Sequence, residues 1–178
     1  MANINAAAIL TRVREVVDDA AGSLRTISST RFGESFYIEM SDDEQSRKAV
    51  SGPKYDVRMT GLERHPASSP VNGSTALYNV EIEVTVARHL NVAHAVIDAN
   101  RDTILAAAME DGDHIAQALM YPGNLSTTTG GTSTGLASGM LQFEGSDTEV
   151  ILGAASEPSL VRSVHRFRGV AVVTLATS

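Results

Sequence analysis

Cysteine and tryptophan are absent from the 178 residues, and aromatic side chains make up only 4% of them. Without cysteine the chain has no disulfide, no thiolate nucleophile and no cysteine ligand for zinc or an iron–sulfur cluster. Such a composition fits a protein that stays in a reducing cytosol. The shortage of aromatic rings also leaves few platforms on which nucleic-acid bases could stack.

Positive charge is in deficit, with 14 Lys and Arg against 21 Asp and Glu and a net charge of −7. Proteins that grip nucleic acid normally carry a basic surplus, so binding along a phosphate backbone is disfavoured. No apolar run approaches the 18 residues of a membrane span, and charges within residues 3–20 argue against a signal peptide or anchor. With 43% hydrophobic residues, residues 1–178 are expected to form one globular domain.

Three helices are expected from apolar residues that recur at steps of three and four. The first covers residues 3–24, with Asn3 as its cap and Gly22 near its end. The second begins after Asn91 and continues to about residue 109. The sequence Asp-Gly-Asp at 111–113 is expected to interrupt the helical pattern, so that Asp113 caps a third helix ending near residue 120.

Strands are expected where apolar and polar residues alternate. The clearest is 77–90, in which Val80, Ile82, Val84 and Val86 share one face and Glu81 and Glu83 the other. Further strands are expected at 55–62, 140–143, 148–152 and 160–175, and a short strand or loop at 36–40. The last strand is expected to bend at Gly169, where a β-bulge is one explanation. This order predicts an α+β fold: a mostly antiparallel β-sheet with helices packed on one face, in a single domain.

Residues 124–139 are rich in Ser, Thr and Gly and uncharged, which is typical of a mobile loop. The loop lacks the lysine of a phosphate-binding P-loop, and its Gly-x-Ser-x-Gly string at 131–135 has no strand-to-helix elbow around it. A further interpretation is a loop that becomes ordered against a partner. Its threonines Thr128, Thr132 and Thr134 are then candidate interface residues.

Other candidates for chemistry are weak. His89, His94 and Asp98 come closest to a metal site, but their spacing does not place two imidazoles on one helix face. The acidic run at 42–44 is expected to be a solvated surface. We therefore expect no catalytic residue, no metal and no cofactor.

Charged residues form two rows on the predicted sheet. Arg162, Arg166 and Arg168 share one face of the last strand, and Glu81 and Glu83 share one face of the long strand. Within one subunit the two rows could form cross-strand pairs or simply be solvated. Between copies they could direct the head-to-tail contact that closes a ring. These five residues are the other candidate interface residues.

The chain resembles the tail terminator, or tail-completion, family of tailed bacteriophages. The features that carry the resemblance are the opening helix INAAAILTRVREVV, the strand LYNVEIEVTVA, the helix VIDANRDTILAAAM, the Ser/Thr/Gly loop and the closing strand SVHRFRGVAVVTL. The resemblance covers nearly the whole chain as a layout. It implies a structural virion protein, not an enzyme, that forms a hexameric ring on the tail tube, ends tube polymerisation and joins the tail to the neck.

The resemblance also implies the partners and location of such a ring. The partners would be further copies of the chain, the tail tube protein and head-completion or neck proteins, at the tail–neck junction of a virion assembled in the host cytoplasm. DNA would pass through the ring without specific binding, and no membrane would be involved. The alternatives are another neck component, such as a head-completion or adaptor protein, and a small hydrolase or ligand-binding domain. A deep pocket with convergent polar groups would favour the last, and flat contact surfaces would favour a ring subunit.

Overall fold

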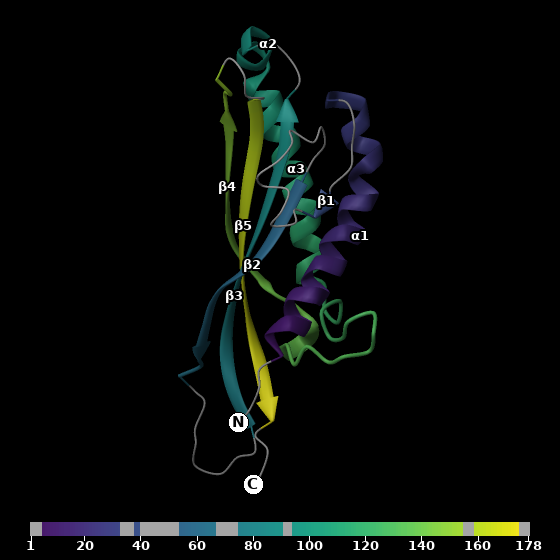
Figure 1. Ribbon diagram of the computed structural model, residues 1–178, viewed down its shortest axis with the longest axis vertical. Coiled ribbons are helices and arrows are strands. Elements are labelled where there is room, and N and C mark those ends of the chain that lie inside the picture. Colours follow the sequence, from purple (N-terminus) through teal and green to yellow (C-terminus); the bar gives the residue numbers. More distant parts are fainter. Residues whose placement is uncertain are drawn as a thin grey trace.

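The computed structural model describes residues 5–32, 38–39, 54–66, 75–90, 94–154 and 159–174. One five-stranded sheet runs the length of the molecule, with the helices along one side of it (Figure 1). The elements follow in the order α1 (Ala6–Phe32), β1 (Ile38–Glu39), β2 (Lys54–Arg64), β3 (Thr75–Leu90), α2 (His94–Ala99), α3 (Arg101–Met120), the short 3₁₀ helix η2 (Ala137–Gly139), β4 (Gln142–Ile151) and β5 (Ser159–Thr174).

The strands lie in the order β1-β2-β3-β5-β4. The pairs β2–β3, β3–β5 and β4–β5 are antiparallel, and only the two-residue β1 is parallel to its neighbour. The longest seam joins β3 to β5 over 16 residue pairs, from Thr75 with Thr174 to Leu90 with Ser159. The sheet is therefore two antiparallel hairpins, β2–β3 and β4–β5, joined through β3 and β5.

The predicted fold class is confirmed: a single compact α+β domain with a four-strand antiparallel sheet and helices on one face. The period-two pattern of β3 sends its valines and isoleucine toward α1 and α3, where they are buried with apolar residues from β2 and β5. We call this side of the sheet the inner face and the opposite side the outer face. The largest fully buried apolar side chains are Phe167, Ile9, Ile82, Ile97, Ile115, Leu119, Leu125 and Leu141.

Helix α1 begins later and ends later than its sequence pattern predicts. The Asn5 side chain accepts a hydrogen bond from the Ala8 backbone N–H at 3.2 Å, so Asn5 acts as the cap, and Asn3 lies outside the described residues. The helix continues past Gly22 to Phe32. A single glycine lowers helix stability by only about 1 kcal/mol relative to alanine, which does not end a helix that is otherwise favourable.

The helical break is at Asn100 and not at 111–113, so that prediction is wrong. Helix α2 ends at Ala99, and α3 then runs without interruption to Met120. Asp113 is therefore inside a helix and caps nothing. Asp111 and Gly112 are both buried, and their contacts with β3 and β5, described below, hold this turn helical against its local preference. None of the described helices is long and apolar enough to cross a membrane.

The end of the chain also differs from its prediction. Residues 142–151 form one strand with a register shift between Phe143 and Gly145, where two short strands were expected. In β5 the register passes through Gly169 without a shift, so no bulge lies there. A Cβ at Gly169 would approach Leu141 Cδ2 to 2.6 Å, so this glycine serves close packing under the segment that leads into β4.

Candidate functional site

The outer face of the sheet carries the predicted row of arginines along β5, the strand between β3 and β4. Arg162, Arg166 and Arg168 are all exposed there. Register places Arg166 opposite Glu83 and Arg168 opposite Glu81, so the two predicted rows are neighbours within one subunit. The structure therefore brings all five of these residues onto one surface.

Acidic residues flank this row on both sides. Arg166 Nη1 donates to Asp147 Oδ2 on β4 at 2.7 Å, and its Nε lies 3.8 Å from Glu83 Oε2 on β3. The hydrogen bond and charge of Asp147 raise the pKa of Arg166. Arg166 is thus paired inside its own chain, on both of its strand neighbours.

The other two arginines are also paired within the chain, Arg168 on both neighbouring strands and Arg162 with β4. Arg168 lies 3.9 Å from Glu81 on β3 and 3.8 Å from Glu144 on β4, nitrogen to oxygen. Arg162 donates to Glu149 Oε1 from Nε at 2.9 Å and from Nη2 at 2.5 Å. Cross-strand pairing within a subunit, one of the two predicted alternatives, is therefore observed. A role in contacts between copies stays a prediction.

The Ser/Thr/Gly segment is folded against the domain, where its composition predicts a mobile loop. Leu125 and Leu136 are buried in the main core, and Leu136 forms a β-bridge with Ala171 beyond the end of β4. Thr134 is 2% exposed, and its hydroxyl donates to the backbone carbonyls of Leu125 and Ser126. Thr134 is therefore an internal anchor of the loop within one chain, and its role as an interface residue stays a prediction.

The tip of the loop, residues 127–133, is a short hairpin. Thr127 and Ser133 form a β-bridge, and the Thr128 N–H donates to the Thr132 carbonyl at 2.9 Å. Thr128 Oγ1 also accepts from the Thr132 N–H at 3.1 Å, and Thr132 is exposed. Thr128 and Thr132 keep the accessible positions that an interface residue needs, although Thr128 is partly covered.

A carboxylate on α1 holds this hairpin. Glu15 accepts hydrogen bonds from the Thr129 N–H, the shorter at 3.0 Å, and from Arg12 Nη1 at 2.8 Å. Arg12 Nε in turn donates to the Asn124 carbonyl at 2.7 Å. The hydrogen bond from Arg12, followed by those from Thr129, lowers the pKa of Glu15. An Arg–Glu pair thus fastens the loop to α1 at its base and near its tip.

Neither a phosphate cradle nor a nucleophile elbow is formed by the loop. The glycines at 130 and 131 turn the hairpin, and Ser133 Oγ accepts from the Gly135 N–H at 3.3 Å. Gly135 has a φ of 71°, and a Cβ there would lie 2.8 Å from the Val172 carbonyl oxygen. A glycine is needed at position 135 because the backbone approaches β5 closely there. The Val172 N–H donates to the Gly135 carbonyl oxygen at 2.7 Å.

Two of the three metal-site candidates, His94 and Asp98, lie within the described side chains. His94 and Asp98 are exposed on the short helix α2, and the side chain of His89 and residues 42–44 lie outside what the structure describes. Among the described residues no three His, Asp or Glu side chains come close enough to hold a metal ion.

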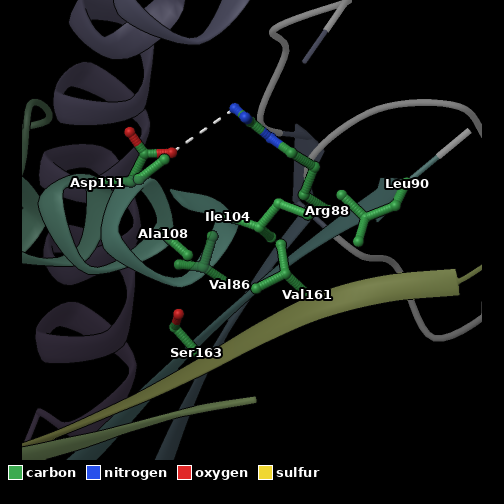
Figure 2. A pocket seen from close by; sticks show the side chains of 9 residues that line it. Val86, Arg88, Leu90, Ile104, Ala108, Asp111, Val161 and Ser163 are labelled. Carbon is green, nitrogen blue, oxygen red and sulfur yellow. Dashed lines mark ion pairs between the residues drawn. The ribbon is translucent and has the colours of Figure 1, made fainter. Parts of the chain in front are cut away.

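A small cavity lies between β3, β5 and α3 (Figure 2). Its volume is about 20 Å³, room for about one water molecule. Arg88 on β3 and Asp111 on α3 form a buried ion pair at its edge, and Ser163 lies on β5 below them. The remaining lining is apolar: Val86, Leu90, Ile104, Ala107, Ala108 and Val161.

Sequence reasoning missed this ion pair and the role of His165. Arg88 has the same parity as Val84 and Val86, so a charge on the apolar face of the clearest strand was a readable signal. His165 faces the same side of β5 as Phe167, and it is 2% exposed.

Comparison of the chain with models of protein families and with curated proteins finds no match.

Proposed function

We propose that this protein is a structural subunit of a tailed bacteriophage that assembles into a hexameric ring, caps the tail tube as a tail terminator and joins it to the neck. The observation that supports this most is the uncovered outer face. Helices α1 and α3 pack on the inner face only (Figure 1), which leaves β2, β3, β5 and β4 with a long charged surface that no described element covers. A broad charged surface of this kind is available for contact with a protein of complementary charge.

The charges of this face are held in place before any partner arrives. Arg166 and Arg168 each contact acids on both flanking strands, so their side chains are restrained on the sheet. Restraint lowers the side-chain entropy that an interface loses on assembly. Alternating acids and arginines also give a surface that can match a second protein by charge without gripping phosphate, in keeping with the net charge of −7.

The pockets of the described residues give less support to a small-molecule enzyme. The small cavity holds about one water, and its polar lining groups already contact other residues: Arg88 pairs with Asp111, and Ser163 hydrogen-bonds Thr148. A wider hollow of about 390 Å³ lies open beside α1, lined by Thr11, Arg14, Glu15, Asp18 and Tyr55. It is polar and shallow, unlike the enclosed and mostly apolar pockets that bind small ligands.

The first test is the solution mass by light scattering over a range of concentrations. A ring subunit should give a species near six times 18.8 kDa. If the chain is a monomer in solution, ring closure is tested on a tube template: the monomer is mixed with purified tail tubes and examined by electron microscopy. Rings at tube ends and arrest of tube growth are expected. A chain that stays monomeric and leaves tube length unchanged would overturn the proposal.

A further inference from the structure

His165 lies where β5 meets α3 on the inner face of the sheet. Its neighbours across the strands are Val84 on β3 and Ser146 on β4, neither of which carries a charge. The side chain is 2% exposed, and its Nε2 has no hydrogen-bond partner among the described residues. Because a buried N–H without an acceptor is costly, we assign the bare lone pair to Nε2 and the proton of the neutral ring to Nδ1.

Helix α3 rests directly on this ring through Gly112. A Cβ built at Gly112 would lie 2.1 Å from His165 Cε1 and 2.6 Å from Nε2, so the helix backbone approaches as closely as glycine allows. No water fits between the two at such contact. The glycine in the middle of α3 costs about 1 kcal/mol of helix propensity, which this close packing offsets.

The charged groups around the ring are few and unevenly placed. On α3, Asp113 is exposed and its charge favours a protonated His165, whereas Asp111 is directed to Arg88 on β3. On β4, Asp147 faces outward and binds Arg166. Burial is the larger influence on the ring and lowers the pKa of His165, with Asp113 opposing it.

We propose that His165 makes the packing of α3 on the sheet acid-labile, so that protonation of its ring releases the helix before the rest of the domain unfolds. A proton at Nε2 would place a cation against the Gly112 backbone with no acceptor and no water. The ring can gain solvent only if α3 moves away. Such a movement uncovers the apolar stripe of the helix, which includes Ile104, Ile115 and Leu119.

The direction of the pH effect follows from linkage. Above the ordinary histidine pKa of 6.5 the ring is neutral in both the folded and the unfolded chain, and the stability is complete. As the pH falls below that value, His165 is protonated in the unfolded or opened chain but stays neutral in the packed chain, where its pKa is lower. The α3 contact therefore weakens progressively from about neutral pH downward until the packed ring itself is protonated.

The test is hydrogen exchange of the α3 amides at pH 7.5 and pH 5.5, corrected for the pH dependence of the intrinsic rate. In the unaltered chain the opening of α3 should become about tenfold more frequent at pH 5.5, while the amides of β3 change little. His165→Gln and His165→Leu remove the titrating ring and should abolish the difference. His114→Gln, at an exposed position of the same helix, should keep it.

Two results would overturn the proposal. One is the same pH effect on α3 in the His165 variants as in the unaltered chain. The other needs no variant and comes from NMR titration of the five histidine rings of the unaltered chain. It is a His165 ring that titrates with the ordinary histidine pKa of 6.5 while the α3 amides stay protected from exchange.

Discussion

Arg88 Nη2 on β3 lies 3.6 Å from Asp111 Oδ2 on α3, and the two side chains are only 9% and 10% exposed. The pair lies beside the small cavity (Figure 2). Along β3, Arg88 lies between Val86 of the main core and Leu90 of a second apolar cluster, which also contains Ile97, Ile104, Val150 and Val161. The pair therefore fixes α3 to the sheet at a point where apolar packing is interrupted.

Removing one partner of this pair should be costly. Asp111→Ala leaves the Arg88 charge buried beside the cavity, and we expect a loss of about 3–5 kcal/mol in the free energy of unfolding, measured with urea. Replacing both residues, as Arg88→Met with Asp111→Leu, should recover most of it. Glu149→Ala, which breaks the exposed pair with Arg162, is the control and should cost less than about 1 kcal/mol. Equal losses in the two single variants would contradict this account.

Gly112→Ala tests the contact between α3 and the His165 ring. Alanine favours a helix, but its Cβ would overlap His165 Cε1, and overpacking of this kind costs about 1–3 kcal/mol. Gly130→Ala is the matched control, because the nearest atom to its new Cβ is 3.8 Å away. Urea unfolding should show a loss only at position 112. Adding His165→Ala to Gly112→Ala should bring the loss below the sum of the two single effects.

Glu15→Ala should release the tip of the Ser/Thr/Gly loop. We expect the Thr129 amide to exchange on the order of tenfold faster, because it loses a charged acceptor. Since the pKa of Glu15 is lowered from 4.5, the attachment is complete above that pH and is lost as the pH falls through the folded-state value. Asp19→Ala, an exposed carboxylate on the same helix, is the control. Unchanged exchange at Thr129 would show that the hairpin holds itself.

Charge reversal on the outer face bears on the proposed ring. Arg166→Glu with Arg168→Glu puts carboxylates beside Glu83 and Asp147, so we expect the concentration for half-assembly to rise at least about tenfold. The melting temperature should change by only a few degrees, since exposed pairs contribute little to stability. Arg101→Glu, exposed on α3, is the control. An unchanged mass distribution by light scattering would remove both arginines from the interface.

The sheet was predictable because its signal is local. Alternation along 77–90 assigns Val84 inward and Glu83 outward, and no distant residue is needed to decide it. The same parity made the pairing of Glu83 with Arg166 one of two open alternatives. Parity does not determine which strand lies beside which. The pairing of Arg166 with Asp147 follows only from the position of β4 beside β5.

The helix that passes through 111–113 was not predictable in this way. Local preference favours a break at Asp-Gly-Asp, and the partners that overrule it, Arg88 and His165, lie on strands far along the chain. The prediction that residues 124–139 form a mobile loop is inaccurate for the same reason. Their composition predicts a loop, but their attachment depends on Glu15, which is more than a hundred residues away.

The seam between β3 and β5 also governs the order in which this protein can fold. The β2–β3 and β4–β5 hairpins can each close over a short connection, but Thr75 must find Thr174 and Leu90 must find Ser159 across α2, α3 and the loop. Contacts so distant in sequence make folding slow, because loop-closure entropy is lost before the contact is gained. During synthesis β3 emerges well before β5, so the edge of β3 that later pairs with β5 is exposed until β5 has been made. An exposed strand edge can pair with other chains, which makes this stage prone to aggregation.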